Sequence, residues 1–369
     1  MSYITSIGTA NPTHKFHQSV IAEFMARAMQ LPTDEEKKLY ALYRATGIEY
    51  RYSVLEDYGR NAQFDFYSNT KNLDPFPSTK QRMEVFKKHA PDLSLKAVRA
   101  CLESSEDFDV SSVTHLIVVS CTGMYAPGLD IDLVKALKLK STVQRTCINF
   151  MGCYAAFNAM KLADTFCKSE VNAKVLIVCT ELCSIHFQKE NTENNWLANA
   201  LFADGSSALL IESQPHLGMN LKLENFFCDL ATEGEQDMVW AIGDLGFEMS
   251  LTSYVPQIIR QGISKLTTSL LARASLKLSD ISYFAIHPGG KKILEAIELE
   301  LGLSKEQNHF SYLVLKNYGN MSSPTVLFVI NEILQTLNES DHGKRILSFA
   351  FGPGLTLESM VLQIEIHGN

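Results

Sequence analysis

Six short apolar runs restrict the fold of this chain more than any other feature of its sequence. They are THLIVVS, AKVLIVCT, SALLIES, SYFAIHP, RILSFAF and SMVLQIEI. Each run is nearly continuous in apolar residues, which is typical of strands that are buried on both faces of a sheet. Segments with helical spacing, such as LSLKAVRACLES, precede the runs, and others separate several of them. The pattern predicts a layered α/β fold.

The order of segments is repeated once along the chain. VTHLIVVSCTG resembles ISYFAIHPGG, INFMGCYAAFNAM resembles KNYGNMSSPTVLFV, KVLIVCTEL resembles KRILSFAFGPG, and SSALLIES resembles LTLESMVLQ. The chain has 369 residues, and single cores stop growing near about 250 to 300 residues. We therefore predict two duplicated halves, residues 1–217 and 218–369, that pack about a pseudo-twofold axis.

The repeat places three polar residues at equivalent points of the two halves. Cys153 and Asn320 each follow a glycine at the expected start of a helix, and His287 follows a strand. About a pseudo-twofold axis the two helix starts approach each other, so we expect the three side chains to share one cavity. A helix N-terminus or an imidazolium lowers the pKa of a thiol, and Gly152 permits a sharp turn in front of Cys153.

Taken alone, each of these residues has an ordinary structural explanation. A free cysteine is among the most buried residue types, and a histidine in this position is often a turn residue. Asn320 can be a helix N-cap. Together, Cys153, His287 and Asn320 supply a nucleophile, a proton carrier and a neutral donor, which is the set that acyl transfer through a thioester requires.

Composition and charge exclude several other classes of protein. The formal net charge is -8 and there is no stripe of Lys and Arg, so a nucleic-acid partner is not expected. No apolar run approaches a membrane span of about 20 residues, and the N-terminus lacks the pattern of a signal peptide, so the expected location is the cytoplasm. The eight cysteines form no disulfide framework, and Cys179, Cys183 and His186 lack the further ligands of a structural metal site.

The same residues resemble the type III polyketide synthases, the chalcone and stilbene synthase family. The similarity extends from YITSIGTANP to FGPGLTLESMVL, and its most specific parts are FMGCYAA, LFADGSSA, HPGG, NYGNMSSPTVLFV and FGPGLT. The resemblance implies a thiolase-like fold of αβαβα layers built from the two duplicated halves, and a homodimer. The catalytic cysteine, histidine and asparagine of the family fall on Cys153, His287 and Asn320.

The activity that the resemblance implies is iterative decarboxylative Claisen condensation of malonyl-CoA onto an acyl starter. The starter acyl-CoA acylates the Cys153 thiolate, which His287 stabilises as an imidazolium. His287 and Asn320 then donate to the enolate oxygen that forms when malonyl-CoA loses carbon dioxide. The lengthened chain closes to a phenolic or pyrone product. The thioester and the carboxylate supply the energy, so no cofactor is expected beyond these coenzyme A thioester substrates.

Further residues are assigned to the cavity by resemblance. Phe202 matches the gatekeeping phenylalanine between the CoA tunnel and the cavity, and Met249 replaces the second one. Trp240 falls where chalcone-forming members carry glycine, although a packing role explains it equally well. His186 and Cys121 replace cavity-lining threonines. These departures favour a bacterial-like member whose product is not chalcone.

The remaining assignments concern substrate contacts. Gly289 and Gly290 in HPGG, and Gly354 in FGPGLT, allow a ligand to approach the backbone closely. The basic cluster that binds CoA phosphates in the family falls between Arg44 and Arg51, and these two residues are the candidates. Each is equally explained as an ordinary surface arginine.

Two other functions remain open at this stage. A ketoacyl synthase that initiates fatty-acid synthesis uses a similar cysteine, histidine and asparagine for a single condensation with a carrier protein. A catalytically silent thiolase-fold protein would act as a scaffold or binding module. The contexts HPGG, GNMSSP and FGPGLT favour the polyketide synthase over the first, and the presence of all three reactive residues disfavours the second.

Overall fold

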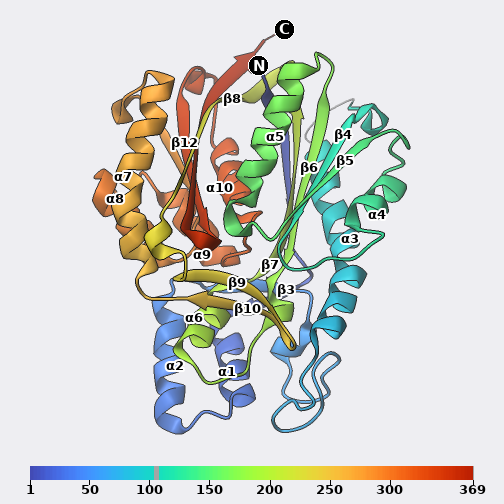
Figure 1. Ribbon diagram of the computed structural model, residues 1–369, viewed down its shortest axis with the longest axis vertical. Coiled ribbons are helices and arrows are strands. Elements are labelled where there is room, and N and C mark those ends of the chain that lie inside the picture. The colour runs from blue at the N-terminus through green and yellow to red at the C-terminus, as the bar shows by residue number, and fades with distance from the viewer. Residues whose placement is uncertain (104–107, 369) are drawn as a thin grey trace.

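The structure is a computed structural model that describes residues 1–103 and 108–368. A nine-stranded mixed sheet runs through it (Figure 1). In spatial order the strands are β11 (Tyr283–Ile286), β12 (Arg345–Gly352), β13 (Thr356–His367), β8 (Gly218–Leu230), β1 (Tyr3–Ala10), β7 (Asp204–Glu212), β6 (Lys174–Leu182), β4 (His115–Ser120) and β5 (Gln144–Asn149).

The two sets of strands follow the same order, as the repeat in the sequence predicts. In the first set β4 and β6 are parallel, and β6–β7 and β7–β1 are antiparallel. In the second set β11 and β12 are parallel, and β12–β13 and β13–β8 are antiparallel. In the part of the sheet that the structure describes, a short pairing of β1 with β8 joins the two sets. The helix α9 (His309–Tyr318) occupies the place where the repeat predicted a strand or loop equivalent to β5.

Helices form three layers around the two sets of strands, which gives the expected αβαβα arrangement (Figure 1). Two helices lie between the sets, α3 and α4 cover the outer face of the first set, and α7 and α8 cover that of the second. The bounds are α5 (Ala155–Ser169) and α10 (Thr325–Leu334) in the centre, then α3 (Thr79–Glu103), α4 (Leu129–Ala136), α7 (Val255–Ala274) and α8 (Lys291–Leu301).

Burial of both faces explains the continuous apolar runs. In β4, Ile117 and Val119 belong to the hydrophobic cluster around α5 and α10. The alternate residues Leu116 and Val118 belong to the cluster around α3. Because successive strand residues point to opposite faces, a strand between two helical layers needs apolar residues at every position.

The remaining elements gather at one end of the molecule, next to the ends of the central helices (Figure 1). They are α1 (Gln18–Ala28), α2 (Thr33–Ala45), α6 (Glu193–Leu201), the pair β2 (His14–His17) and β3 (Tyr50–Ser53), and the hairpin β9 (Met238–Gly243) and β10 (Gly246–Leu251). Short 3₁₀ turns cover Glu56–Gly59, Val110–Ser112, Gly152–Tyr154, Cys183–His186, Thr232–Gly234, Leu278–Asp280, Glu339–Asp341 and Pro353–Leu355. Among the helices described, none has both the length and the apolar character needed to cross a membrane.

Candidate active site

Cys153 lies in a tight turn between β5 and α5. Gly152 has a φ of 79°, and a Cβ atom there would lie 2.2 Å from the ring of Pro353, so the turn requires glycine. Ala155 and Ala156 are fully buried, which lets the first turn of α5 pack tightly beneath the thiol. The fold thus holds Cys153, itself 7% exposed, at the inner end of a central helix.

Asn320 lies at the corresponding point of the second half. Its backbone N–H donates to the Leu201 carbonyl at 2.9 Å, and its own carbonyl accepts from the N–H of Ala203 at 2.8 Å. The side-chain Nδ2 lies 4.0 Å from Cys153 Sγ. The helix α10 begins only at Thr325, so Asn320 precedes the helix and the N-cap explanation is wrong.

The Asn320 side chain has a fixed orientation. The Oδ1 atom accepts from the backbone N–H of Ser322 at 2.8 Å, and Nδ2 donates to the Gly289 carbonyl at 3.3 Å. Oδ1 lies 3.9 Å and Nδ2 lies 4.0 Å from Cys153 Sγ, so both ends of the amide lie beside the thiol. Since the oxygen already accepts from Ser322, the nitrogen is the end that can donate to a ligand next to Cys153. The amide is therefore oriented as a hydrogen-bond donor beside the thiol.

His287 directly follows β11, and the structure buries it almost completely. Its backbone N–H donates to the Phe349 carbonyl at 2.8 Å, and Gly289 donates back to the His287 carbonyl at 2.9 Å. Within the described residues, neither ring nitrogen has a hydrogen-bond partner. An unmet buried polar group costs about 1–3 kcal/mol, so two of them on one ring indicate a place reserved for a ligand.

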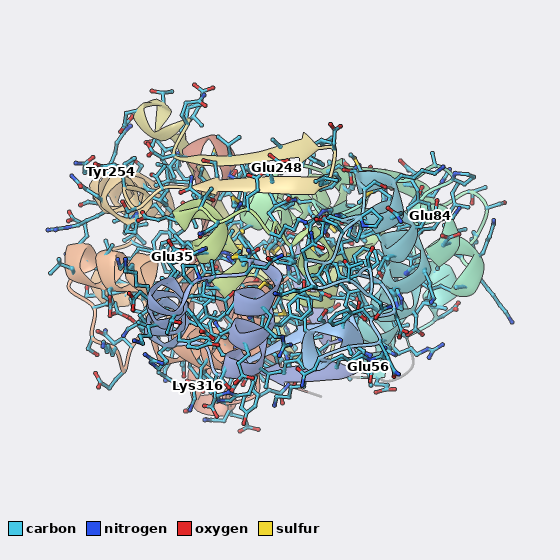
Figure 2. The ribbon with its side chains drawn as sticks, turned by 90° about the horizontal axis from the view of Figure 1, so that it is seen from below. Glu35, Glu56, Glu84, Glu248, Tyr254 and Lys316 are labelled. Carbon is cyan, nitrogen blue, oxygen red and sulfur yellow. The ribbon has the colours of Figure 1, made fainter. Side chains whose placement is uncertain are left out.

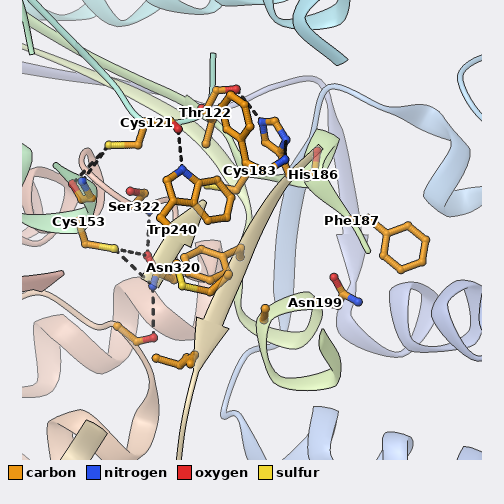
Figure 3. A pocket seen from close by; sticks show the side chains of 18 of the residues that line it. Cys121, Thr122, Cys153, Cys183, His186, Phe187, Asn199, Trp240, Asn320 and Ser322 are labelled. Atoms are coloured by element: carbon orange, nitrogen blue, oxygen red, sulfur yellow. Dashed lines mark hydrogen bonds between the residues drawn. The ribbon is translucent and has the colours of Figure 1, made fainter. Parts of the chain in front are cut away.

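The three side chains line one cavity with a free volume of about 80 Å³. Its lining also contains most residues that the sequence assigned to it, namely Phe202, Met249, Trp240, His186, Cys121 and Gly289. Figure 3 shows Cys153, Asn320 and Trp240 around this space. The predicted convergence of positions from both halves of the chain is therefore confirmed.

Two aromatic side chains form a rigid wall of the cavity. Trp240 donates from Nε1 to the Cys121 carbonyl at 2.8 Å, and its ring meets the His186 ring edge-on (Figure 3). His186 donates from Nε2 to the Thr122 carbonyl and accepts at Nδ1 from the N–H of Phe247. Burial lowers the pKa of His186 to about 3. Both nitrogens of this neutral ring are engaged, so His186 shapes the cavity and has no free lone pair for a metal.

Other predicted cavity residues have clear positions. Met249 lies opposite Trp240 in the β9–β10 hairpin. Phe202 is the C-cap residue of α6, and its backbone forms an isolated parallel β-bridge with the backbone of Asn320. Cys121 accepts at Sγ from the N–H of Gly152 at 3.0 Å, so its thiol helps to hold the turn in front of Cys153.

Arg51 lines the cavity, whereas the predicted contacts Arg44 and Gly354 line neither the cavity nor the cleft described next. Arg51 is only 4% exposed, and its guanidinium donates to Gln18 and to two backbone carbonyls, so it does not offer a surface cation to CoA phosphates. This burial corrects the sequence-based expectation. Arg44 is exposed on α2 but lines neither this cavity nor the cleft described next. In the 353–355 turn the cavity wall is formed by Pro353 instead of Gly354.

A second, open cleft of about 530 Å³ adjoins the cavity. The two share Leu251, Gly289 and Ile293 in their linings. Figure 2 labels Glu35 and Tyr254, which mark the starts of α2 and α7, the elements on either side of the cleft. Its lining includes Gly290, Lys38, Lys291 and Lys292. Sequence reasoning missed these lysines, although Lys291 and Lys292 directly follow HPGG.

The electrostatics of the cavity differ from those that the resemblance implies. Burial raises the pKa of Cys153 to about 12, and hydrogen bonds from Ser322 and Asn320 offset only part of this effect. Burial also lowers the pKa of His287 to about 3. Both shifts disfavour the charged forms, so the cavity holds a neutral thiol and a neutral imidazole in place of a thiolate and an imidazolium.

The raised pKa of Cys153 predicts a steep pH dependence of alkylation. The reactive form is the thiolate, and below the thiol pKa its fraction rises about tenfold for each pH unit. We therefore expect iodoacetamide to modify Cys153 about tenfold faster per unit from pH 6 to pH 9, as measured by mass spectrometry of the Cys153 peptide. The exposed Cys147 provides an internal reference. A rate that is flat over this range would instead reveal a stabilised thiolate.

Comparison with known proteins agrees with the fold. Family models described as the N-terminal and C-terminal domains of chalcone and stilbene synthases match residues 1–215 and 226–365. The alpha-pyrone synthesis polyketide synthase-like protein Pks18 of Mycobacterium tuberculosis is 30% identical over 99% of this chain and 91% of its own.

Solved structures show the same likeness. The chain is similar to PKS-I of the brown alga Ectocarpus siliculosus, with a TM-score of 0.90, 30% identity and 98% of each chain covered. It is also similar to the C-terminal type III polyketide synthase domain of a type I/III hybrid from Dictyostelium, with a TM-score of 0.89, 27% identity, and 98% of this chain and 99% of that one covered. These matches confirm the thiolase-like fold, and with the family models they show that the chain belongs to the chalcone and stilbene synthases as a type III polyketide synthase, an acyltransferase.

Proposed function

We propose that Cys153, His287 and Asn320 catalyse the repeated condensation of malonyl-CoA onto a small acyl starter. The observation that carries this proposal is the convergence of a thiol, an amide donor and an imidazole with two unpaired nitrogens in one buried cavity. Such a set can accept an acyl group and stabilise an oxyanion in the same space.

The adjoining cleft is our candidate route for coenzyme A. Lys38, Lys291 and Lys292 line it, and Lys38 and Lys292 form no salt bridge with any residue described. These cations suit the phosphates of CoA. Gly289 and Ile293 line both spaces, so a pantetheine arm that passes them reaches the cavity of Cys153. A homodimer is supported by the edge strand β5, which pairs only with β4 in the described sheet.

In the first step the starter is loaded onto Cys153. Since the thiol and the imidazole are both neutral, His287 accepts the thiol proton while Cys153 Sγ attacks the thioester carbonyl. The bond between the acyl carbon and the CoA sulfur breaks, and the CoA thiolate leaves with the proton from His287. The acyl group is then a thioester of Cys153.

In the second step malonyl-CoA supplies two carbons. Its thioester oxygen accepts hydrogen bonds from Asn320 Nδ2 and from a ring N–H of His287. The bond to the carboxylate breaks, carbon dioxide leaves, and the electron pair forms an enolate. The enolate carbon attacks the acyl group on Cys153, releasing the thiolate of Cys153 and a chain lengthened by two carbons on CoA. No metal or redox cofactor is required, because no net oxidation occurs.

We propose a short chain closed to a pyrone as the product. The narrow cavity and its wall of Trp240 and His186 support this choice. The similarity to Pks18, whose name refers to alpha-pyrone synthesis, supports it as well.

The proposed function is tested by product analysis. The purified protein is incubated with malonyl-CoA and a panel of aliphatic and aromatic acyl-CoAs, and the products are identified by mass spectrometry. We expect carbon dioxide release and pyrones from small starters. A single condensation that requires malonyl-carrier protein would indicate a ketoacyl synthase, and binding without turnover would indicate a scaffold protein.

The cavity wall gives a prediction about product size. Replacing Trp240 by alanine removes an indole that lines the cavity and bonds to the Cys121 carbonyl. We expect Trp240→Ala to accept larger starters or to add at least one further malonyl unit, as measured by mass spectrometry of the products. Trp196, the other tryptophan, lines the adjoining cleft instead of this cavity, so Trp196→Ala is expected to leave the product distribution unchanged even where it alters CoA binding. An unchanged product distribution in Trp240→Ala would contradict a size-limiting role.

A further inference from the structure

The C-terminal end of α6 contacts the candidate active site through its backbone. Its last carbonyls, and that of its C-cap residue Phe202, accept hydrogen bonds from three other segments of the chain. Leu201 accepts from the backbone N–H of Asn320 at 2.9 Å. The others, with their donors, are Asn199 with Arg51 Nη1 at 2.7 Å, Ala200 with Gln18 Nε2 at 2.8 Å, and Phe202 with Arg51 Nη1 at 2.7 Å.

Arg51 is the centre of this arrangement. It reaches α6 from β3 and is buried, and its Nε donates to Gln18 Oε1 at 2.8 Å. One side chain thereby binds two carbonyls and also orients the glutamine that binds a third. Burial lowers the pKa of Arg51, and the side chains of Tyr43, Tyr58 and Asp204 offset part of this effect. The negative end of the α6 dipole also favours the charged guanidinium.

The aliphatic part of the Arg51 side chain also restricts which residue can stand at position 319, directly before Asn320. Gly319 has a φ of 71°, and a Cβ atom there would lie 2.9 Å from Arg51 Cγ and 3.1 Å from the Leu201 carbonyl oxygen. Arg51 therefore binds Phe202, one partner of the backbone bridge, and lies against Gly319, which directly precedes the other partner, Asn320. A shift of the C-terminal end of α6 would therefore move Phe202 and Asn320 together.

We propose that Arg51 is a positioning residue that fixes Phe202 and Asn320 relative to Cys153 through the end of α6. This inference rests on the proposed role of Asn320 as the donor to the enolate oxygen. Arginine suits the task because Nη1 binds two carbonyls while Nε, in the same rigid plane, binds Gln18, and the single ammonium of lysine cannot reproduce this geometry.

The test separates the two chemical steps. Acylation uses Cys153 and His287, whereas decarboxylation uses His287 and Asn320. We expect Arg51→Lys and Arg51→Met to lower kcat for malonyl-CoA decarboxylation by about 10- to 100-fold, because a displacement of about 1 Å in a catalytic group has an effect of this size. The rate of acylation of Cys153, followed by mass spectrometry of the intact protein, should change by less than about threefold.

The exposed Arg44 supplies the matched control, since Arg44→Met removes the same type of side chain away from both cavities. Normal decarboxylation in Arg51→Lys would overturn the proposal, and so would an equal loss in both steps. If neither Arg51 variant folds, Gln18→Ala provides the second test, because it removes the partner of Arg51 Nε and the donor to Ala200. We expect the same division between steps in Gln18→Ala, and unchanged decarboxylation there would overturn the proposal.

Failure of this inference can be told apart from failure of the proposed function. Asn320→Ala is measured in parallel with the Arg51 variants. If Asn320→Ala decarboxylates normally, the role of Asn320 itself is wrong. If only the Arg51 variants decarboxylate normally, the role of Asn320 stands and the positioning role of Arg51 falls.

Discussion

Replacing Cys153 by alanine is expected to abolish product formation, with a loss of at least about 10⁴-fold in kcat. The variant has no atom that can carry the acyl group, so no thioester forms and the enolate has no electrophile. His287 and Asn320 remain in place, however, and malonyl-CoA can still lose carbon dioxide in their presence. We therefore expect Cys153→Ala to release carbon dioxide and acetyl-CoA from malonyl-CoA while forming no extended product.

Three measurements check this prediction. Intact-protein mass spectrometry should show no acyl adduct after incubation with a starter acyl-CoA, product analysis should show no extended chain, and carbon dioxide release should persist. Cys183→Ala is the matched control, because Cys183 is also buried and lines the same cavity. Retention of normal condensation in Cys153→Ala would remove Cys153 from the mechanism.

The fold was predictable because its determinants are local and repeated. Strands such as β4 lie between two helical layers, and this requirement appears directly as a continuous apolar run. The duplication indicated that Cys153 and Asn320 occupy equivalent positions in the two halves. The prediction was wrong where the halves differ, since the helix α9 lies at the position where a strand or loop equivalent to β5 was expected.

The surroundings of the reactive groups were less predictable, because they depend on tertiary contacts. Arg51 is buried because it donates hydrogen bonds to the carbonyls of Asn199 and Phe202 at the end of α6. The sequence around Arg51 does not reveal these contacts. The neutral state of Cys153 and His287 likewise follows from burial by residues far away in the chain. Spacing along the sequence indicates which groups meet, whereas their charge depends on how completely the fold excludes water.

Replacing Asn320 by alanine is expected to slow decarboxylation of malonyl-CoA by about 10² to 10³-fold, the usual effect of removing one oxyanion donor. The Nδ2 group lies 4.0 Å from Cys153 Sγ, and it is the end of the amide that can donate because Oδ1 already accepts from the N–H of Ser322. Without the amide, the enolate oxygen retains only the donor from His287. Acylation of Cys153 does not create this enolate, so its rate should change little.

Two further variants sharpen the test of Asn320. Ser322→Ala keeps the backbone N–H that orients the amide, so it should decarboxylate at nearly the normal rate. Asn320→Asp keeps the shape of the side chain but replaces the donor by a carboxylate, which repels the enolate when ionised. We expect its decarboxylation to be at least as slow as that of Asn320→Ala. If Asn320→Asp decarboxylated malonyl-CoA at the normal rate, the side chain at position 320 would serve only to fill space. Our proposal requires the rate to fall when the donated hydrogen bond is lost, even though the volume of the side chain is kept.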